Sequence, residues 1–222
     1  SGASPLIERN VISKNVCRNG SWNYGAGIYI DGGATPSIVN NEIIDNQNTA
    51  GSRGYGGGIF VDGVPAPEIV GNVIARNTCL STTSRNYGGG IRVYSSAAAN
   101  IVNNTIVGNT ATRGAGIEYA GTTAGRALMN IIAANVGSGL DAGTAVPTDF
   151  NNLWNNSGGN YAGSAKAGPN SFSLDPLFPG PGDYHLTFRS PCVDAGHVPM
   201  LSPVTAKDYD GDPRRLDGNL DG

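Results

Sequence analysis

One pattern of eleven residues recurs along the chain and constrains its fold more than any other feature. It reads Pro-x-Ile-x-x-Asn-x-Ile-x-x-Asn, and its first three copies begin at Pro5, Pro36 and Pro67. A fourth copy has Ala99 at the proline position, and two shorter copies follow it. The first asparagines of successive copies are 31, 31, 32, 26 and 21 residues apart. Repeats of this length indicate one supersecondary unit stacked on itself, which is a solenoid.

Each unit carries a second block, and this block indicates the kind of solenoid. It reads Tyr-Gly-x-Gly-Ile from Tyr24, Tyr55 and Tyr87, and Arg113 opens the fourth copy. The residues that follow alternate with the period of two expected of a strand with one buried face. With the two β-branched stretches of the first pattern, each unit has three short strands. We therefore expect an all-β, right-handed, single-stranded parallel β-helix of about five to six coils, with coils about 4.8 Å apart.

Stacking of the units gives the repeated residues structural roles. The isoleucines form three interior columns, which include Ile38, Ile43 and Ile59. Four asparagines are expected at the corner between the second and third strands, where Asn tolerates left-handed backbone and can bond its equivalent on the next coil. These are Asn10, Asn41, Asn72 and Asn104. The glycines before each strand suit a tight turn with positive φ and not a phosphate-binding loop.

Composition and cysteine spacing exclude several classes of protein. The 222 residues carry a formal net charge of −3 and no basic run, which argues against nucleic acid as a partner. No stretch predicts a transmembrane segment or a signal peptide. Cys17 and Cys79 share a register two coils apart, roughly 9.6 Å at the spacing of paired strands, beyond the reach of a disulfide. We expect free thiols.

The repeat also predicts how the chain is divided. Residues 1–160 form the β-helix repeats, and residues 161–222 form a C-terminal connector and cap with an Asp/Gly-rich tail. Residues 2–5 match residues 33–36, so the sequence starts in mid-coil. Because an uncovered first coil is an open sheet edge, we expect these residues to be an excerpt, with the remainder of a longer polypeptide N-terminal to Ser1.

Three motifs in the second region carry a resemblance to a known family. They are Asp175-Pro-Leu-Phe178, Gly182-Asp-Tyr-His-Leu186 and Ser190-Pro-Cys-Val-Asp-Ala-Gly196, which follow the coil ending at Trp154. Together with the repeats, they resemble the bacterial secreted right-handed parallel β-helix repeat proteins of the pectate-lyase-like superfamily. The resemblance implies an exported protein associated with polysaccharide or the cell surface, without implying one reaction. His197 departs from the acidic residue that the resemblance implies after Asp-Ala-Gly.

The tail contains a candidate calcium site. Asp217, Asn219 and Asp221 occupy positions 1, 3 and 5 of a calcium loop, with Gly222 at position 6. Three further carboxylates precede them: Asp208, Asp210 and Asp212. The sequence ends before the carboxylate of position 12, so a solvated Asp/Gly turn cluster stays open as the alternative.

The outward face of the Gly-Gly-Ile strand is the expected functional surface. Alternation places one outward column at Tyr29, Phe60, Arg92 and Glu118, and the next at Asp31, Asp62 and Tyr94. Flat aromatic rings beside carboxylates suit an extended sugar chain. Three structural alternatives stay open. Asp31 and Asp62 could be turn residues, and Tyr24, Tyr55 and Tyr87 could only stack on one another. Arg92 and Glu118 could form an ordinary surface ion pair that contributes under about 1 kcal/mol.

Two function classes follow. In the first, the chain is an extracellular or cell-surface scaffold that binds polysaccharide or a surface protein. In the second, it is a polysaccharide lyase or glycoside hydrolase acting on acidic glycans, with Asp31, Asp62 and Arg92 as catalytic candidates. Calcium is the only cofactor expected. His185 and His197 fall in the cap, where structural roles are expected. The sequence favours the scaffold.

Overall fold

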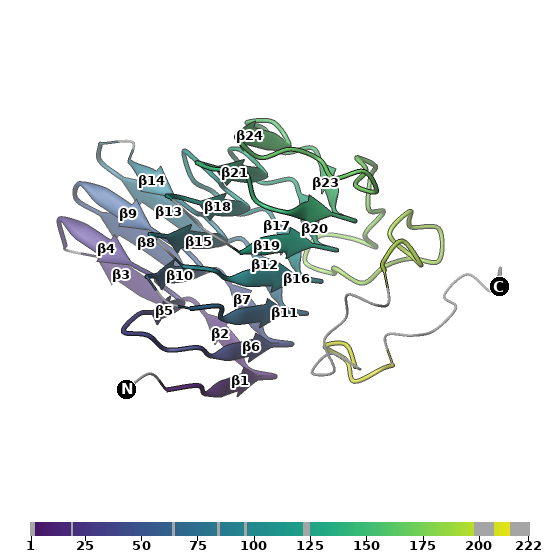
Figure 1. Ribbon diagram of the computed structural model, residues 1–222, viewed down its shortest axis with the longest axis horizontal. Coiled ribbons are helices and arrows are strands. Elements are labelled where there is room, and N and C mark those ends of the chain that lie inside the picture. The colour runs from purple at the N-terminus through teal and green to yellow at the C-terminus, as the bar shows by residue number, and fades with distance from the viewer. Residues whose placement is uncertain are drawn as a thin grey trace.

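Short strands stacked into parallel sheets make up the body of the chain (Figure 1). The computed structural model describes residues 3–18, 20–63, 65–83, 85–95, 97–121, 125–197 and 207–213. Each coil adds one strand to each of three sheets of six strands, so the expected parallel β-helix of about five to six coils is confirmed. None of the described residues forms a helix that could span a bilayer.

The three long sheets each take one strand from every coil. The first contains β1 (Leu6–Glu8), β6 (Ser37–Val39), β11 (Glu68–Val70), β16 (Asn100–Val102), β19 (Arg126–Leu128) and β22 (Thr148–Asp149). The second contains β2 (Val11–Ser13), β7 (Glu42–Ile44), β12 (Val73–Ala75), β17 (Thr105–Val107), β20 (Ile131–Ala133) and β23 (Asn152–Trp154). The third contains β5 (Ile28–Ile30), β10 (Ile59–Asp62), β15 (Ile91–Tyr94), β18 (Ile117–Tyr119), β21 (Leu140–Ala142) and β24 (Tyr161–Gly163).

The first three coils carry two further strands each. These form a sheet of β3 (Val16–Arg18), β8 (Gln47–Ala50) and β13 (Thr78–Ser81), and a sheet of β4 (Trp22–Tyr24), β9 (Arg53–Tyr55) and β14 (Asn86–Tyr87). The three strands per coil that the sequence predicted are present in these coils too, and most of segments 46–54 and 77–86 is paired in the two additional sheets, which were not predicted.

The register between coils places like residues on like residues. Ile38 pairs with Ile69, Ile43 with Ile74 and Ile59 with Ile91, and the isoleucines of these columns are fully buried from the second coil onward. A continuous apolar interior therefore runs along the stack, as the sequence predicted. Its burial is the main favourable contribution to folding.

Asparagine ladders hold the corners. The side-chain Nδ2 of Asn41 donates to Oδ1 of Asn72 at 3.0 Å, and Asn72 repeats the bond to Asn104 at 2.9 Å. The predicted ladder is confirmed, but the left-handed residue is the one before the ladder asparagine: Asn40 has φ 52° and Gly71 has φ 70°. The asparagine itself is thereby free to satisfy buried carbonyl groups of both coils.

A second ladder stands at the next corner. Asn46 donates to Asn77 at 2.9 Å, and the bonds continue through Asn109, Asn135 and Asn156. The residue before each of the first two is again left-handed, with φ 57° at Asp45 and φ 54° at Arg76. Both corners of the repeated pattern therefore have the same structure, in which an asparagine closes a turn and forms a hydrogen bond with the next coil.

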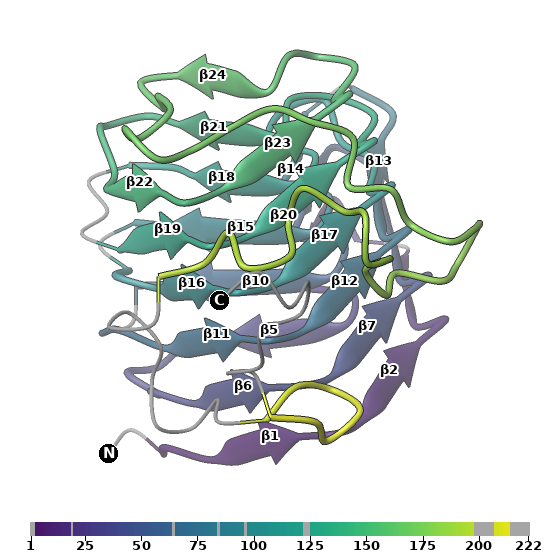
Figure 2. The same cartoon turned by 90° about the vertical axis from the view of Figure 1, so that its right-hand side faces the viewer.

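The chain beyond the repeats turns back along the outside of the stack (Figure 2). Its strand β24 pairs with β21, so the coils continue past residue 160, where the sequence placed their end. From there the chain crosses the outer side of β20, β17 and β12, and Arg76 donates from the coils to the Tyr184 hydroxyl at 2.9 Å. The second region is therefore packed against the side of the coils.

The cysteines are free thiols, as predicted. Asn48 lies between Cys17 and Cys79 in the strand register, which keeps the two sulfurs on non-adjacent coils. Cys192 accepts a hydrogen bond from Asn152 at 3.1 Å.

Candidate ligand-binding face

The predicted outward column exists as a register, but most of it is covered. Tyr29 pairs with Phe60, Phe60 with Arg92, and Arg92 with Glu118. Tyr29 is 45% exposed, whereas Phe60, Arg92 and Glu118 are 1%, 5% and 2% exposed. The expectation of an open column is therefore wrong for the last three residues. They point outward from their strands and are covered by another part of the same coils.

The cover is a ladder of tyrosines on the neighbouring short sheet. Tyr24, Tyr55 and Tyr87 stack in register, with ring centroids 5.3 and 5.8 Å apart. Tyr24 also stacks on Tyr29 at 5.7 Å and on Phe60 at 5.4 Å. Offset ring pairs at these distances are favourable beyond their area of contact. The predicted stacking of the tyrosines is correct, and it joins the two sheets.

A left-handed glycine after each tyrosine makes this folding-over possible. Gly56 and Gly88 both have φ 68°, and a Cβ on Gly88 would lie 2.5 Å from Cβ of Arg92. The turn therefore needs both the positive φ and the missing side chain. This explains the first glycine of the Tyr-Gly-x-Gly-Ile block.

The tyrosine ladder encloses a cation. The Arg92 guanidinium lies 4.4 Å from the ring centroid of Tyr55, 4.5 Å from Tyr87 and 5.0 Å from Tyr94. Its Nη1 lies 3.2 Å from Oε2 of Glu118, an ion pair with almost no exposure. The interpretation of these two residues as an ordinary surface ion pair is wrong, because Tyr55, Tyr87 and their neighbours exclude water from it.

Burial dominates the titration of this pair. It raises the pKa of Glu118 to about 7 against the opposing attraction of Arg92, and it lowers the pKa of Arg92. The Nη1–Oε2 contact lacks the direction of a hydrogen bond, and Nε of Arg92 has no partner among the described residues. The pair is thus held by charge and by rings more than by hydrogen bonds.

Asp141 continues the column beyond Glu118. It is buried, and Arg113 reaches it from the tyrosine side with Nε 3.1 Å from Oδ2. The sequence analysis missed both residues as members of this cluster. The signal was present: Arg113 stands where Tyr87 stands one coil earlier, and Gly139-Leu-Asp141 keeps the spacing of Gly116-Ile-Glu118.

The part of the face that reaches solvent is a patch of four residues, Tyr29, Asp31, Asp62 and Tyr94, of which Asp62 is half-buried and the others are exposed. We call it the aromatic–carboxylate patch. Asp62 lies opposite Tyr94 in the strand register. Burial, together with the neighbouring carboxylate of Asp31, raises the pKa of Tyr29 to about 12. Burial and the charge of Asp31 also raise the pKa of Asp62, while Arg92 opposes that shift. All four were predicted as ligand-binding residues, and the structure brings them together.

A second exposed aromatic group extends the same side of the molecule. Trp22 shares the face of its strand with Tyr24, two residues away, and is 53% exposed. On the next coil, Arg53 pairs with Trp22 in the strand register, and its guanidinium lies 5.0 Å from the centroid of the Trp22 ring. Trp22 was not predicted, because the strand that carries it is not one of the three that the repeat predicts.

Only part of the predicted calcium site falls within the described residues. Asp217, Asn219 and Asp221 lie outside the described residues. Of the preceding carboxylates, Asp208 accepts from the backbone N–H groups of Gly211 and Asp212, and Asp210 contacts His185 Nε2 at 3.0 Å. Over the ranges that the structure describes, no three His, Cys, Asp or Glu side chains are grouped to hold a metal.

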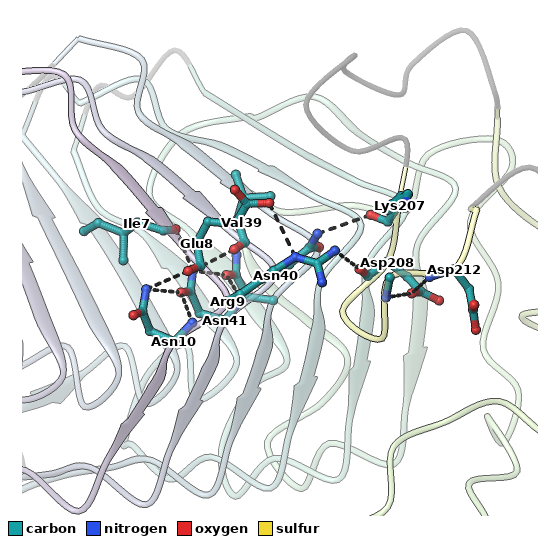
Figure 3. A network of polar contacts seen from close by, with 12 residues as sticks. Ile7, Glu8, Arg9, Asn10, Val39, Asn40, Asn41, Lys207, Asp208 and Asp212 are labelled. Atoms are coloured by element: carbon teal, nitrogen blue, oxygen red, sulfur yellow. Dashed lines mark hydrogen bonds and ion pairs between the residues drawn. The ribbon is translucent and has the colours of Figure 1, made fainter.

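The segment around Asp208 is instead bound to the first coils (Figure 3). Arg9 reaches the carbonyl oxygen of Asp208 at 3.5 Å, and Asn40 donates to that of Lys207 at 3.2 Å. The carboxylate of Asp208 closes its own turn by accepting from the backbone N–H groups of Gly211 and Asp212.

A cleft of about 740 Å³ lies between this segment and the coils. Its lining includes Glu42, Asp183, His185, Phe188 and Asp210. Both ring nitrogens of His185 already contact carboxylates, one of Asp183 and one of Asp210, which raises the pKa of His185. The imidazole of His185 and the carboxylates of Asp183 and Asp210 are thus engaged with one another.

Comparison with known proteins gives one family. A family model described as the right-handed β-helix region matches residues 1–167, and its description agrees with the hand expected for the coil. No curated protein matches the chain. No solved structure matches it either.

Proposed function

The chain belongs to the right-handed β-helix family, and we propose that it is an extracellular or cell-surface scaffold that binds polysaccharide along the side carrying the aromatic–carboxylate patch. One observation carries the proposal: the rings of Tyr29, Tyr94 and Trp22 are 45%, 44% and 53% exposed, although Phe60, which pairs with Tyr29 in the strand register, is covered. Exposed rings on a rigid sheet suit the apolar faces of sugars, and adjacent carboxylates suit sugar hydroxyls.

The coil itself supports an extended ligand. Strand-bearing coils repeat at about 4.8 Å, so Tyr29 and Tyr94, two coils apart, are separated by roughly 10 Å along the stack. This is the length of a short run of sugar rings. Because the side chains stand on paired strands, binding needs little ordering of the protein, which lowers the cost of association.

A surface protein is the other partner that this face would suit, and the same variants test it. The patch is polar and aromatic, which fits a glycan better than the apolar centre of a protein interface. We therefore favour polysaccharide.

Catalysis is the second candidate, and one observation favours it. Asp31 and Asp62 lie on neighbouring coils, and the pKa of Asp62 is raised by burial and by the charge of Asp31. A carboxyl group with a raised pKa beside a second carboxylate is the arrangement that a glycoside hydrolase uses. Arg92, the expected basic group of a lyase, is buried under tyrosine rings and contributes no exposed charge.

Binding and cleavage are separated by one set of variants. We expect Tyr29→Ala and Tyr94→Ala each to weaken retention of a bound oligosaccharide by about fivefold, since a stacked ring contributes on the order of 1 kcal/mol. Phe188→Ala, which removes a ring that is 73% exposed on the C-terminal segment, is the matched control and keeps full retention.

The assay follows retention on a panel of neutral, acidic and amine-bearing oligosaccharides together with release of new reducing or unsaturated ends. Retention that is lost equally in Phe188→Ala and Tyr29→Ala would remove the patch from the account. New chain ends that the wild type releases and Asp62→Asn does not would replace the scaffold by an enzyme.

A further inference from the structure

The charges of the aromatic–carboxylate patch are unbalanced at its surface. Neither Asp31 nor Asp62 takes part in any ion pair between described residues. The cation that acts on Asp62 is Arg92, which is buried and paired with Glu118. Arg53 stacks on Trp22. The two carboxylates therefore present negative charge that no exposed cation of the patch neutralises.

The rings beside these carboxylates belong to a wall that already binds a cation. Arg92 lies within 5.0 Å of three ring centroids, and one of them is the Tyr94 ring that flanks Asp62. Tyr94 is 44% exposed, so its ring also borders solvent. Aromatic faces attract cations most strongly where water is excluded, and a neighbouring carboxylate adds to that attraction. Aromatic rings and carboxylates at one place are the groups that recognise an ammonium ion.

We propose that the glycan bound by this patch carries primary amines, as a deacetylated amino sugar does, with an ammonium group seated between Asp31, Asp62 and the exposed rings. This inference rests on the proposed function and names its substrate class. A uronate carboxylate at the same place would meet two like charges. An acidic glycan, the substrate expected from the sequence for an enzyme, is therefore disfavoured here.

The test uses three hexasaccharides on the whole chain: the β-1,4-linked glucosamine oligomer, its fully N-acetylated counterpart, and a polygalacturonate oligomer. The first two differ only in whether the amino groups are acetylated. The ratio of their affinities therefore measures what the ammonium groups contribute to binding. At a pH where the amines are protonated and at low salt, we expect the glucosamine oligomer to bind about tenfold more tightly, with a preference that shrinks as salt is added. The polygalacturonate oligomer should bind most weakly.

Variants assign the preference to the two carboxylates. Asp31→Asn and Asp62→Asn should each lower the preference for the amine form over the acetylated form by about threefold to fivefold. Asp175→Asn, the same change at an exposed carboxylate of the C-terminal segment, should keep the wild-type preference. Measurement of unfolding for each variant shows that its fold is retained.

The outcomes separate this inference from the proposed function. Equal affinity for the two amino-sugar forms, or tighter binding of polygalacturonate, overturns the amine inference and leaves a glycan-binding face. A preference that survives in both Asp→Asn variants also overturns it, because the ammonium then binds elsewhere. Absence of binding to all three oligomers and to the wider panel overturns the proposed function, and the inference with it.

Discussion

At the scale of single residues, the side chain with the most unusual environment is Glu118. It points outward from a strand, yet it is 2% exposed and lies beside Arg92, Arg113 and Asp141. Desolvation of a carboxylate favours its protonated form, and here that effect exceeds the attraction of a guanidinium in contact. A buried ion pair in this column therefore does not by itself stabilise the fold at neutral pH.

The raised pKa of Glu118 predicts how stability depends on pH. Its pKa is about 7 in the fold against an ordinary value of 4.5, so the folded state holds the proton more tightly than the unfolded state. Its contribution is present below about pH 4.5 and is lost as the pH rises through about 7. The free energy of unfolding should fall across this window by on the order of 2 kcal/mol more in the wild type than in Glu118→Gln.

Urea unfolding between pH 4.5 and 8 measures this difference. Glu68→Gln removes a carboxyl group from the outer side of another sheet and should keep the pH dependence of the wild type. If Glu118→Gln has the same slope as the wild type, the carboxyl group of Glu118 titrates normally and is not desolvated in solution.

At the scale of elements, the turn between the short sheet and the third long sheet decides what the protein exposes. This turn brings Tyr55 and Tyr87 over Phe60 and Arg92, and its glycines permit the approach. Without it, the outward column would be an open groove. The turn is thus the element that converts a predicted binding groove into a smaller exposed patch beside a buried charge cluster.

We expect Gly88→Ala to cost more stability than Gly63→Ala. Both positions have positive φ, 68° and 57°, but a Cβ on Gly88 meets the Cβ of Arg92 at 2.5 Å and one on Gly63 meets nothing within 4 Å. Gly63→Ala should therefore cost only the backbone strain of about 1 kcal/mol, and Gly88→Ala at least about 2 kcal/mol. Thermal unfolding of the two variants compares them, and equal losses would mean that the close approach at Arg92 is relaxed in solution.

Much of the coil could be predicted from sequence because its determinants are periodic. Ile38, Ile69 and Asn72 recur at fixed spacing, and parallel stacking of equivalent residues leaves one register. The short sheets could not be predicted in the same way. The sequences of β8 and β9 are polar or contain glycine, and they show no alternation of apolar and polar residues. These strands pair with neighbouring strands but do not bury an apolar face, so no periodic pattern marks them.

That omission explains the errors at the site. Phe60, Arg92 and Glu118 were assigned correctly to the outward side of their strands, because alternation has a period of two. Whether an outward residue meets water depends on what folds over it, and this was set by strands that the pattern did not show. Tyr29 and Tyr94 remained exposed, so the aromatic–carboxylate patch could be predicted while the buried cluster behind it could not.

In the whole molecule, different sides of the coil have different roles. The C-terminal segment lies along the second long sheet and reaches Arg9 and Asn40 on the first coils (Figures 2 and 3). The aromatic–carboxylate patch belongs to the third long sheet, beside the short sheet of β4, β9 and β14. A rigid stack with one side covered by its own chain leaves the other side to present a ligand-binding face.

The most direct test of that assignment is radical oxidation footprinting of the exposed aromatic side chains with and without the oligosaccharide that binds best. The account predicts slower oxidation of Trp22, Tyr29 and Tyr94 in the complex, with unchanged oxidation of Trp154 and Phe188, which are also exposed. Protection of Phe188 or Trp154 without protection of Tyr29 and Tyr94 would contradict the central claim that the ligand lies along the patch.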